Sequence, residues 1–502
     1  MSAGRAVRVD WRTCLSLIGA VLEALAVPLG LTAGVALLSG ESVVPFVVPA
    51  ALTLAVGFAL RRFERGDLGL REGYLIVALT WLAIAVVGAL PFIVAGNGEL
   101  AKPVNALFES TSGVTTTGAT VVANFDAHGR SIHLWRAILQ WMGGLGILVI
   151  AVALLSQLRV GGAQLMETES QTQDVNKLTP NIEATARLLG RVYAGLTGAM
   201  VLSWLFLGFV GLAPEVTLYD AVAHAFTAVS TAGFSPRPES LGAFSPAIQW
   251  VTIPFMFFGA TNFVLLYHLT QGEPDRLLRS DEFRFYLGAV LGAAALTAGF
   301  LVASGQFTGV EPTVRHSLFQ VVSILTTTGY ATVDFNAWSP AAKHVLFLVM
   351  FSGGMAGSTT CSIKTLRWTI VVKSFRRDLF TEVHPEAIKP VRLSGRVVDE
   401  GVVRDVYAYV LLSIVVFVLL TVFVVTDAAR AGVGDQITEF DALGAAAATF
   451  LNIGPAFGRA GPYGSYAFFP RTTRMAFIVL MWVGRIEIIP VLVLLTPAYW
   501  RS

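Results

Sequence analysis

The chain has 502 residues and a net charge of only +2; 55% of its residues are hydrophobic and 14% are charged. Soluble domains carry about 25% charged residues, and the mean hydropathy of +0.68 is far from theirs. The apolar residues come in long blocks, not in the alternating segments of about ten residues typical of a β-barrel, so the composition predicts an all-α polytopic membrane protein.

Ten long apolar segments follow one another along the chain, and a bilayer crossing takes about 20 helical residues. With a cytoplasmic N-terminus, 24 of the 35 Lys and Arg residues fall in cytoplasmic gaps and ten in outer gaps, while Arg485 lies inside the last segment. Because positive charge is retained on the cytoplasmic side, we expect ten transmembrane helices with both termini cytoplasmic. The segments are 13–39, 43–60, 74–96, 131–156, 185–212, 244–270, 284–304, 340–374, 402–426 and 472–497.

Four outer gaps are too apolar to be plain loops, and each holds a run of about ten residues that suits a re-entrant half-helix. Each run ends in a glycine turn, and the turn glycines Gly118, Gly233, Gly329 and Gly454 are 115, 96 and 125 residues apart. This recurrence predicts four pseudo-symmetric repeats behind two additional N-terminal helices. We place the two helices in 1–70, the repeats in 71–160, 161–272, 273–398 and 399–502, and the pore loops at 105–122, 219–236, 315–335 and 439–458.

This arrangement predicts a binding path for a monovalent cation. Non-helical backbone at membrane depth is tolerated only where it is buried or lines a watery cavity. Four turns around one axis would present rings of carbonyl oxygens that replace an ion's water shell, with the negative ends of four half-helices aimed at them. Thr117 and Thr328 can add hydroxyl oxygens, and the turns contain no Asp or Glu. Neutral oxygens suit K⁺, whereas rings of carboxylates would suggest divalent ions.

The stretch "TTTGYATVDF" from Thr326 to Phe335 resembles the T-V-G-Y-G filter signature of potassium channels. With "FESTSGVTTTGATV", "TAVSTAGFSP", "GGMAGSTTCSIK", "NIGPAFG" and "WVGRIEI", nearly the whole chain resembles the Trk/Ktr/HKT superfamily of potassium uptake proteins, most closely its TrkH branch. The resemblance implies K⁺ as the transported ion. It further implies a preference for K⁺ over Na⁺, because serine at the first glycine position is associated with sodium selectivity in plant relatives and all four positions here are glycine. It also implies these coordinating positions, with the four glycines behind them: Thr116, Thr117, Thr231, Ala232, Thr327, Thr328, Asn452 and Ile453.

The eighth apolar segment is too long for one straight crossing, and its middle reads "FSGGMAGSTTCSIK" (351–364). Gly353, Gly354 and Gly357, followed by Ser358 and Thr359, make a poor helix centre. One reading is a close-packed interface of small residues between helices. The family resemblance implies the other reading, an intramembrane loop that obstructs the pore below the filter and acts as its gate.

Four further polar residues have two readings each. Arg485 either pairs structurally with Glu487 or a carbonyl group, or forms a positive barrier that contacts the gate loop. Lys364 is a second pore charge or, as we favour, the first cytoplasmic anchor of its helix. Glu109 tunes the electrostatics near the filter or caps neighbouring backbone, and for His224 we favour packing over a proton relay.

The leading hypothesis is a gated, channel-like potassium uptake subunit of the bacterial inner membrane, and not an enzyme. A secondary transporter coupling K⁺ to H⁺ or Na⁺ is the alternative, since broken helices serve that class too. Segment 364–404 carries nine Lys and Arg, which indicates attraction to anionic membrane lipid or a docking surface for a regulator. The resemblance implies a homodimer and a separate cytosolic TrkA-type ring that binds nucleotides. We expect no organic cofactor and no nucleic-acid partner.

Overall fold

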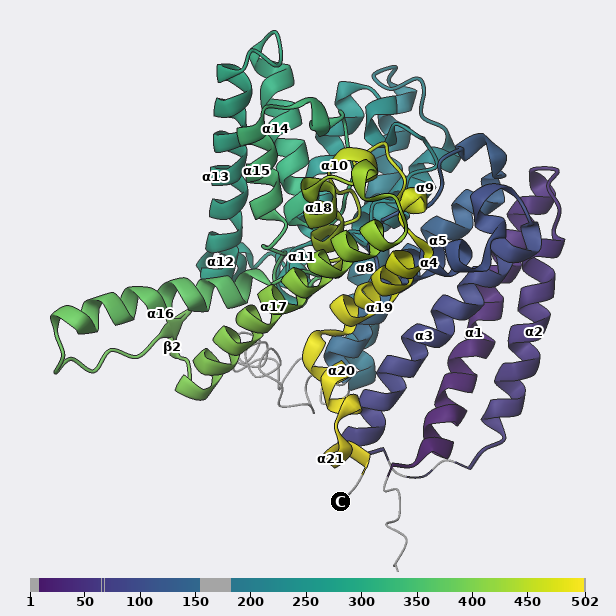
Figure 1. Cartoon of the computed structure of the whole chain (residues 1–502), viewed down its shortest axis with the longest axis horizontal. Helices are drawn as coiled ribbons and strands as arrows, with labels where there is room; N and C mark the ends of the chain where they lie inside the picture. The colour runs from purple at the N-terminus through teal and green to yellow at the C-terminus, as the bar shows by residue number, and fades with distance from the viewer. Residues whose placement is uncertain (1–8, 65, 67, 154–181, 501–502) are drawn as a thin grey trace, which may run out of the picture.

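In the computed structural model, residues 9–64, 66, 68–153 and 182–500 are described. This part of the chain is mostly helical (Figure 1). Among its helices, six are long and apolar enough to cross a membrane, or eight when two bent pairs are each counted as one span. The predicted class, an all-α polytopic membrane protein, is confirmed.

Helices α1 (Trp11–Leu38), α2 (Val44–Arg61) and α3 (Leu70–Ala95) lie together at one edge of the molecule (Figure 1). α1 and α2 approach closely, because a Cβ added at Gly19 would lie 2.7 Å from the backbone of α2. Small residues permit such close helix packing in membranes. The turn between them is held by Glu41, whose carboxylate accepts N–H bonds at the start of α5 (Arg130–Ala153).

Four short helices occupy the positions predicted for half-helices. They have 12 to 16 residues, and each packs against the long helix that precedes it, α3, α8 (Ile182–Phe209), α13 (Asp281–Ala303) or α17 (Glu400–Arg430). Each ends in an irregular turn. The short helices are α4 (Pro103–Val114), α9 (Leu218–Val229), α14 (Val310–Leu325) and α18 (Glu439–Phe450).

Two predicted crossings are sharply bent instead of straight. α10 (Pro246–Gly259) and α11 (Phe263–Thr270) meet at 112°, and α19 (Arg471–Ile486) and α20 (Ile488–Leu495) meet at 110°. Asn262 starts α11 because its side chain accepts the N–H groups of the helix's first turn. At the second break Glu487 has a left-handed φ of 69°.

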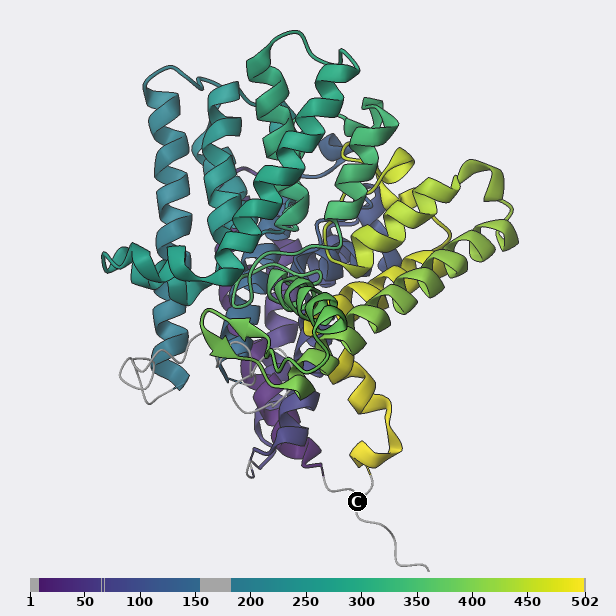
Figure 2. The ribbon, with the colours of Figure 1, turned by 90° about the vertical axis from the view of Figure 1, so that its left-hand side faces the viewer.

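The predicted segment 340–374 contains a break as well. α15 (Pro340–Val349) ends before the glycine-rich stretch, and α16 (Thr365–Val383) leaves in a new direction after it. A small antiparallel hairpin, β1 (Arg392–Leu393) and β2 (Arg396–Val397), then leads to α17. The view in Figure 2 looks nearly along α16, with this hairpin beside it. Two short helices remain: α12 (Pro274–Arg279) follows α11, and α21 (Pro497–Trp500) follows α20.

Candidate functional site

The turns after the four short helices share one backbone conformation. In each, the glycine has φ between 76° and 100°, and the residue two positions before it has φ between 52° and 55°. In the first turn the N–H groups of Thr117 and Gly118 both donate to the Ser112 carbonyl, and the other three turns repeat this pattern. Left-handed φ is uncommon outside glycine, so its recurrence marks the same turn used four times. The left-handed residues are Thr116, Thr231, Thr327 and Asn452.

The four turns form a closed ring. A Cβ added to each turn glycine would lie less than 3.0 Å from a carbonyl oxygen of the next turn, so a side chain there would push two turns apart. The predicted residues are therefore brought together, and the carbonyl oxygens preceding the glycines lie between neighbouring turns. The adjacent pairs are Gly118 with Ala232, Gly233 with Thr328, Gly329 with Ile453, and Gly454 with Thr117.

The segments that follow the turns are cross-linked in the same cyclic order. Each link is a hydrogen bond between one segment and its neighbour, and the last link returns to the first segment. The ring is thus fixed by direct contacts as well as by the helices around it. The links are Arg136 to the Ser235 carbonyl (3.3 Å), Gly242 N–H to the Ala331 carbonyl (3.0 Å), Gly458 N–H to Asn336 (2.8 Å) and Tyr466 N–H to the Thr120 carbonyl (2.8 Å).

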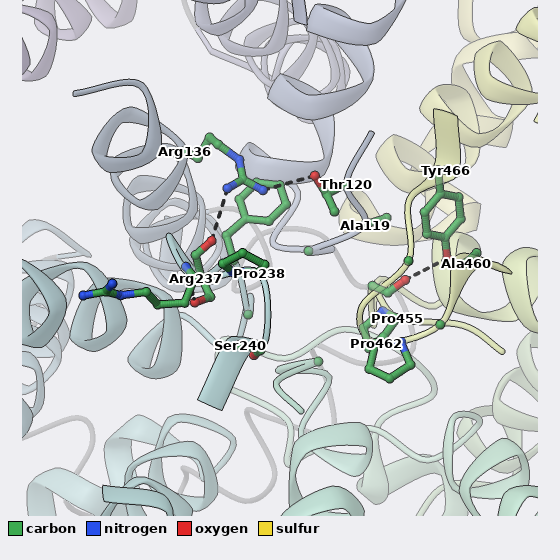
Figure 3. Close-up of a pocket in the computed structure, with 18 of the residues that line it drawn as sticks. Ala119, Thr120, Arg136, Arg237, Pro238, Ser240, Pro455, Ala460, Pro462 and Tyr466 are labelled. Atoms are coloured by element: carbon green, nitrogen blue, oxygen red, sulfur yellow. Dashed lines mark hydrogen bonds between the residues drawn. The ribbon is translucent and has the colours of Figure 1, made fainter. Parts of the chain in front are cut away.

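One cavity lies on this ring, and all four turn glycines line it (Figure 3). Two arginines from different repeats also reach it, and both are neutralised by buried carboxylates. Arg136 bonds Glu109 at 2.8 Å, and Arg237 bonds Asp220 at 2.8 Å. With these charges paired, neutral oxygens are the groups of the ring available to a cation.

Glu109 binds a neighbouring backbone N–H group, which is one of the two roles expected for it from the sequence. Its carboxylate, fully buried, accepts from the Val121 N–H at 2.9 Å and from the Thr120 hydroxyl at 2.8 Å, besides pairing with Arg136. His224 is a buried packing residue, as we favoured. Its ring bonds the Asp220 carbonyl and the Ser235 hydroxyl.

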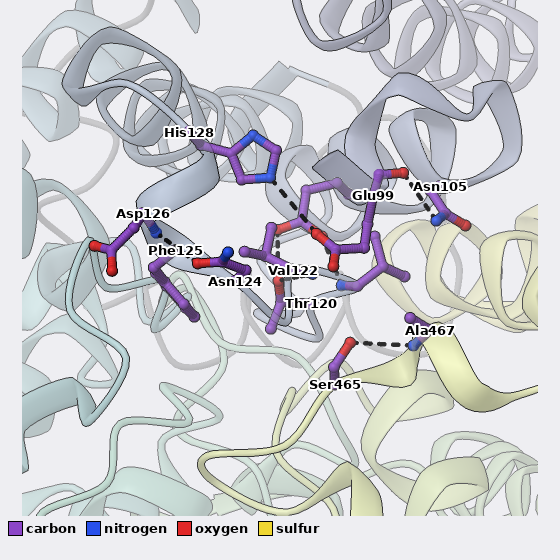
Figure 4. Close-up of polar contacts among 12 residues, drawn as sticks. Glu99, Asn105, Thr120, Val122, Asn124, Phe125, Asp126, His128, Ser465 and Ala467 are labelled. Atoms are coloured by element: carbon purple, nitrogen blue, oxygen red, sulfur yellow. Dashed lines mark hydrogen bonds and ion pairs between the residues drawn. The ribbon is translucent and has the colours of Figure 1, made fainter. Parts of the chain in front are cut away.

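Further polar contacts fix the outer segment of the first repeat (Figure 4). Asn105 donates to the Glu99 carbonyl at 2.9 Å, and Val122 N–H donates to the Thr120 hydroxyl at 3.0 Å. Burial, with the nearby charge of Arg136, lowers the pKa of His128. This ring is therefore neutral at pH 7, and its 3.8 Å approach to Glu99 is not a charged pair.

Sequence reasoning missed Gln140 on α5. Its amide donates to the Ala232 carbonyl at 2.6 Å and accepts from the Phe234 N–H at 2.9 Å. One side chain thus holds the backbone on both sides of Gly233. Arg136 and Gln140 are one helical turn apart in an apolar segment, and that pair of polar residues was the available signal.

The four residues with left-handed φ carry side-chain oxygens, and some of these face the 351–364 loop. The hydroxyl oxygens of Thr231 and Thr327 are bonded to the 351–364 loop, by the Thr359 hydroxyl (3.0 Å) and the Cys361 N–H (3.2 Å). In the described part of the chain, Thr116 Oγ1 and Asn452 Oδ1 are buried without a hydrogen-bond partner. Cys361 Sγ also lies 3.9 Å from the Thr115 carbonyl of the first turn, so the loop lies directly against three of the four turns.

Arg485 contacts this loop. It donates to the Thr359 carbonyl at 2.8 Å and to Cys361 Sγ at 2.9 Å, and on the other side to the Gly143 carbonyl of α5 at 2.8 Å. The expected alternative partner, Glu487, pairs with Arg367 at 2.8 Å instead. Arg485 therefore bonds a backbone carbonyl, as its structural reading expects, and it also contacts the 351–364 loop, as its second reading expects.

The other predicted loop residues do not meet the turns. Gly353 and Gly354 bond within the loop and to Thr365, and the Gly357 carbonyl accepts from the start of α11. The Ser358 hydroxyl bonds Met355 and Thr360 inside the loop. We favoured Lys364 as a cytoplasmic anchor. Its ammonium group donates a hydrogen bond to the Thr360 hydroxyl inside the loop.

Comparisons with known proteins show the family of the chain. The family model TrkH, "cation transport protein", matches residues 46–310 and 308–502. The chain is 35% identical over 466 residues to the Trk system potassium uptake protein TrkH of Halomonas elongata, covering 91% of this chain and 92% of the relative. It is 33% identical to TrkH of Escherichia coli K12, covering 90% and 91%.

A solved structure is similar over almost its whole length. The potassium transporter TrkH from Vibrio parahaemolyticus superposes with a TM-score of 0.87 at 31% sequence identity, covering 98% of this chain and all of that one. Homologues of this kind are transporters and not enzymes. The chain belongs to the TrkH family of cation transport proteins.

Proposed function

We propose that this protein takes up potassium through a channel-like filter made by the four turns. The single observation behind the proposal is the closed ring of glycine against carbonyl oxygen, Gly118 to Ala232 and onward to Gly454 and Thr117. Carbonyl oxygens gathered in this way replace the water shell of a monovalent cation. The relatives named as potassium uptake proteins support K⁺ as the ion. The full coordinating set is Thr116, Thr117, Thr231, Ala232, Thr327, Thr328, Asn452 and Ile453.

The proposed architecture comprises ten spans in the bacterial inner membrane, with both termini cytoplasmic. Two of them precede four repeats, each built of a helix, a half-helix, a filter turn and a helix. The common φ values of the four turns support this repeat, and the excess of Lys and Arg in alternate gaps supports the orientation. The bent pairs α10–α11 and α19–α20 each count as one span.

The 351–364 loop is the proposed gate. It bonds the undersides of two turns through Thr359 and Cys361, and Arg485 holds it from the side of α19. Removing the loop would free the hydroxyl oxygens of Thr231 and Thr327 for an ion. Shortening residues 353–362 is therefore expected to raise K⁺ flux, and unchanged flux in a folded deletion variant would contradict the gate.

The proposed assembly is a homodimer with a cytosolic TrkA-type ring that controls opening by binding nucleotides. The relatives are named as proteins of a Trk system, which supports a partner protein.

Purified protein in liposomes tests the function. A gated pore moves K⁺ down its electrochemical gradient, so its reversal potential follows the K⁺ gradient and ignores an imposed proton gradient. A carrier that couples K⁺ to H⁺ or Na⁺ would shift its reversal potential with the second ion. K⁺ flux at least tenfold above Na⁺ flux is expected, and equal fluxes would contradict a neutral carbonyl filter.

A further inference from the structure

Helix α16 stands apart from the membrane-spanning helices of the fold. It projects from the body across the direction of α13 and α15 (Figures 1 and 2). Lys373 of α16 pairs with Asp281, the first residue of the spanning helix α13. The end of an apolar span marks the boundary between hydrocarbon and headgroups, so this pairing puts the middle of α16 near that boundary.

One face of α16 is an exposed apolar stripe. Phe375, Leu379 and Val383 are four residues apart and therefore lie in one row along the helix. Their side chains are 59%, 54% and 73% exposed. A surface helix with such a row beside charged residues partitions into the interface between headgroups and acyl chains.

A basic cavity adjoins this stripe, between α16 and the segment leading into β1. Its volume is about 380 Å³. Five of its lining residues are cationic, and none of its described lining residues is acidic. The lining consists of Lys373, Arg376, Arg377, Ile388, Lys389, Pro390, Val391 and Arg392.

The cations of the cavity are only partly compensated. Lys373 pairs with Asp281, and Arg377 pairs with Glu400 and Asp378. The described part of the chain offers no ion pair to the three others, Arg376, Lys389 and Arg392. An anion of matching size would neutralise their charges, since guanidinium and ammonium groups bind phosphate oxygens strongly.

We propose that this cavity binds the phosphate of an anionic phospholipid while the acyl chains cover the stripe of Phe375, Leu379 and Val383. Arg376 directly follows Phe375, so headgroup and chain sites are neighbours on one helix. A free phosphate would use the cavity but leave the stripe bare. A protein partner would need acidic groups that fit a pocket of this size. A lipid supplies both halves and lies at this level of the membrane.

Native mass spectrometry of the full chain tests the proposal, with phosphatidylglycerol, phosphatidylcholine and inorganic phosphate as probes. Phosphatidylglycerol is expected to be retained, and the other two are not. The triple variant Arg376→Gln/Lys389→Gln/Arg392→Gln is expected to bind it about 100-fold more weakly, from the attraction of each cation to an anionic surface. Arg12→Gln/Arg62→Gln/Arg279→Gln removes the same charge from other exposed positions and should bind like the parent protein.

The variant Phe375→Ser/Leu379→Ser distinguishes a lipid on the apolar stripe from a protein chain on it. A lipid site predicts weaker phosphatidylglycerol binding with an unchanged oligomeric mass and an unchanged unfolding temperature. The proposal is overturned if inorganic phosphate binds as tightly as the lipid. It is equally overturned if both triple variants lose lipid alike, or if the serine variant changes the oligomeric mass without affecting lipid.

Discussion

Replacing Gly454 by alanine tests the closed ring. The new Cβ would lie 2.6 Å from the Thr117 carbonyl oxygen and 2.8 Å from the Gly118 carbonyl carbon. Ordinary contact begins at 3.4 Å, so the Thr117 oxygen must move by 0.8 Å. Binding groups have to be held to within about 0.5 Å, and overpacking of this kind costs about 1–3 kcal/mol. We expect K⁺ flux to fall about 10- to 100-fold and K⁺/Na⁺ selectivity to decline.

Gly432 in the same repeat provides the matched control. It has a left-handed φ of 72°, and an added Cβ would find nothing within 4 Å. Gly432→Ala therefore carries only the left-handed penalty of about 1 kcal/mol, measurable as a lower unfolding temperature with normal flux. Flux is assayed in liposomes at equal protein incorporation. Parental flux and selectivity in folded Gly454→Ala would refute the filter ring.

Substitutions at three further positions, two of them with a matched control, test contacts around the ring. Arg485→Gln weakens bonds to the 351–364 loop by about 1.5–3 kcal/mol, so flux should rise roughly 10- to 150-fold, and Arg485→Lys, which keeps the charge, should show whether geometry matters. Gln140→Leu should lower K⁺/Na⁺ selectivity more than it lowers the unfolding temperature, because a carbonyl of the proposed filter loses its support. Glu109→Gln breaks a buried ion pair and should cost about 3–5 kcal/mol of unfolding free energy, whereas Asp275→Asn at the exposed pair with Arg279 should cost under about 1 kcal/mol.

The positions of the turns could be predicted because polar residues and glycine interrupt an otherwise apolar chain. Thr116 and Gly118 stand after a run too short to cross the membrane, and Asn452 and Gly454 do the same in the fourth repeat. Both residues of each pair take left-handed backbone conformations. Local sequence was sufficient here because the constraint on φ is itself local.

The supports of the ring could not be predicted in the same way. Gln140 acts on Gly233, 93 positions along the chain, and nothing near Gln140 indicates which turn it reaches. Glu487 forms its ion pair with Arg367 and not with Arg485, although Arg485 is only two residues away in sequence. Such pairings depend on how helices pack, and packing is a long-range property that periodicity does not encode.

The 351–364 loop bonds the backbone groups that one helix break leaves without partners. Backbone groups freed by a break inside a membrane need partners, and the 351–364 loop supplies them at the α10–α11 break. The Ala260 carbonyl accepts from Met355 N–H at 2.9 Å, Asn262 donates to the Ala356 carbonyl at 2.8 Å, and Phe263 N–H donates to the Gly357 carbonyl. A loop that moved away to open the pore would leave these groups unbonded unless water replaced it. Opening of the proposed gate and wetting of the pore beneath the filter are therefore one event.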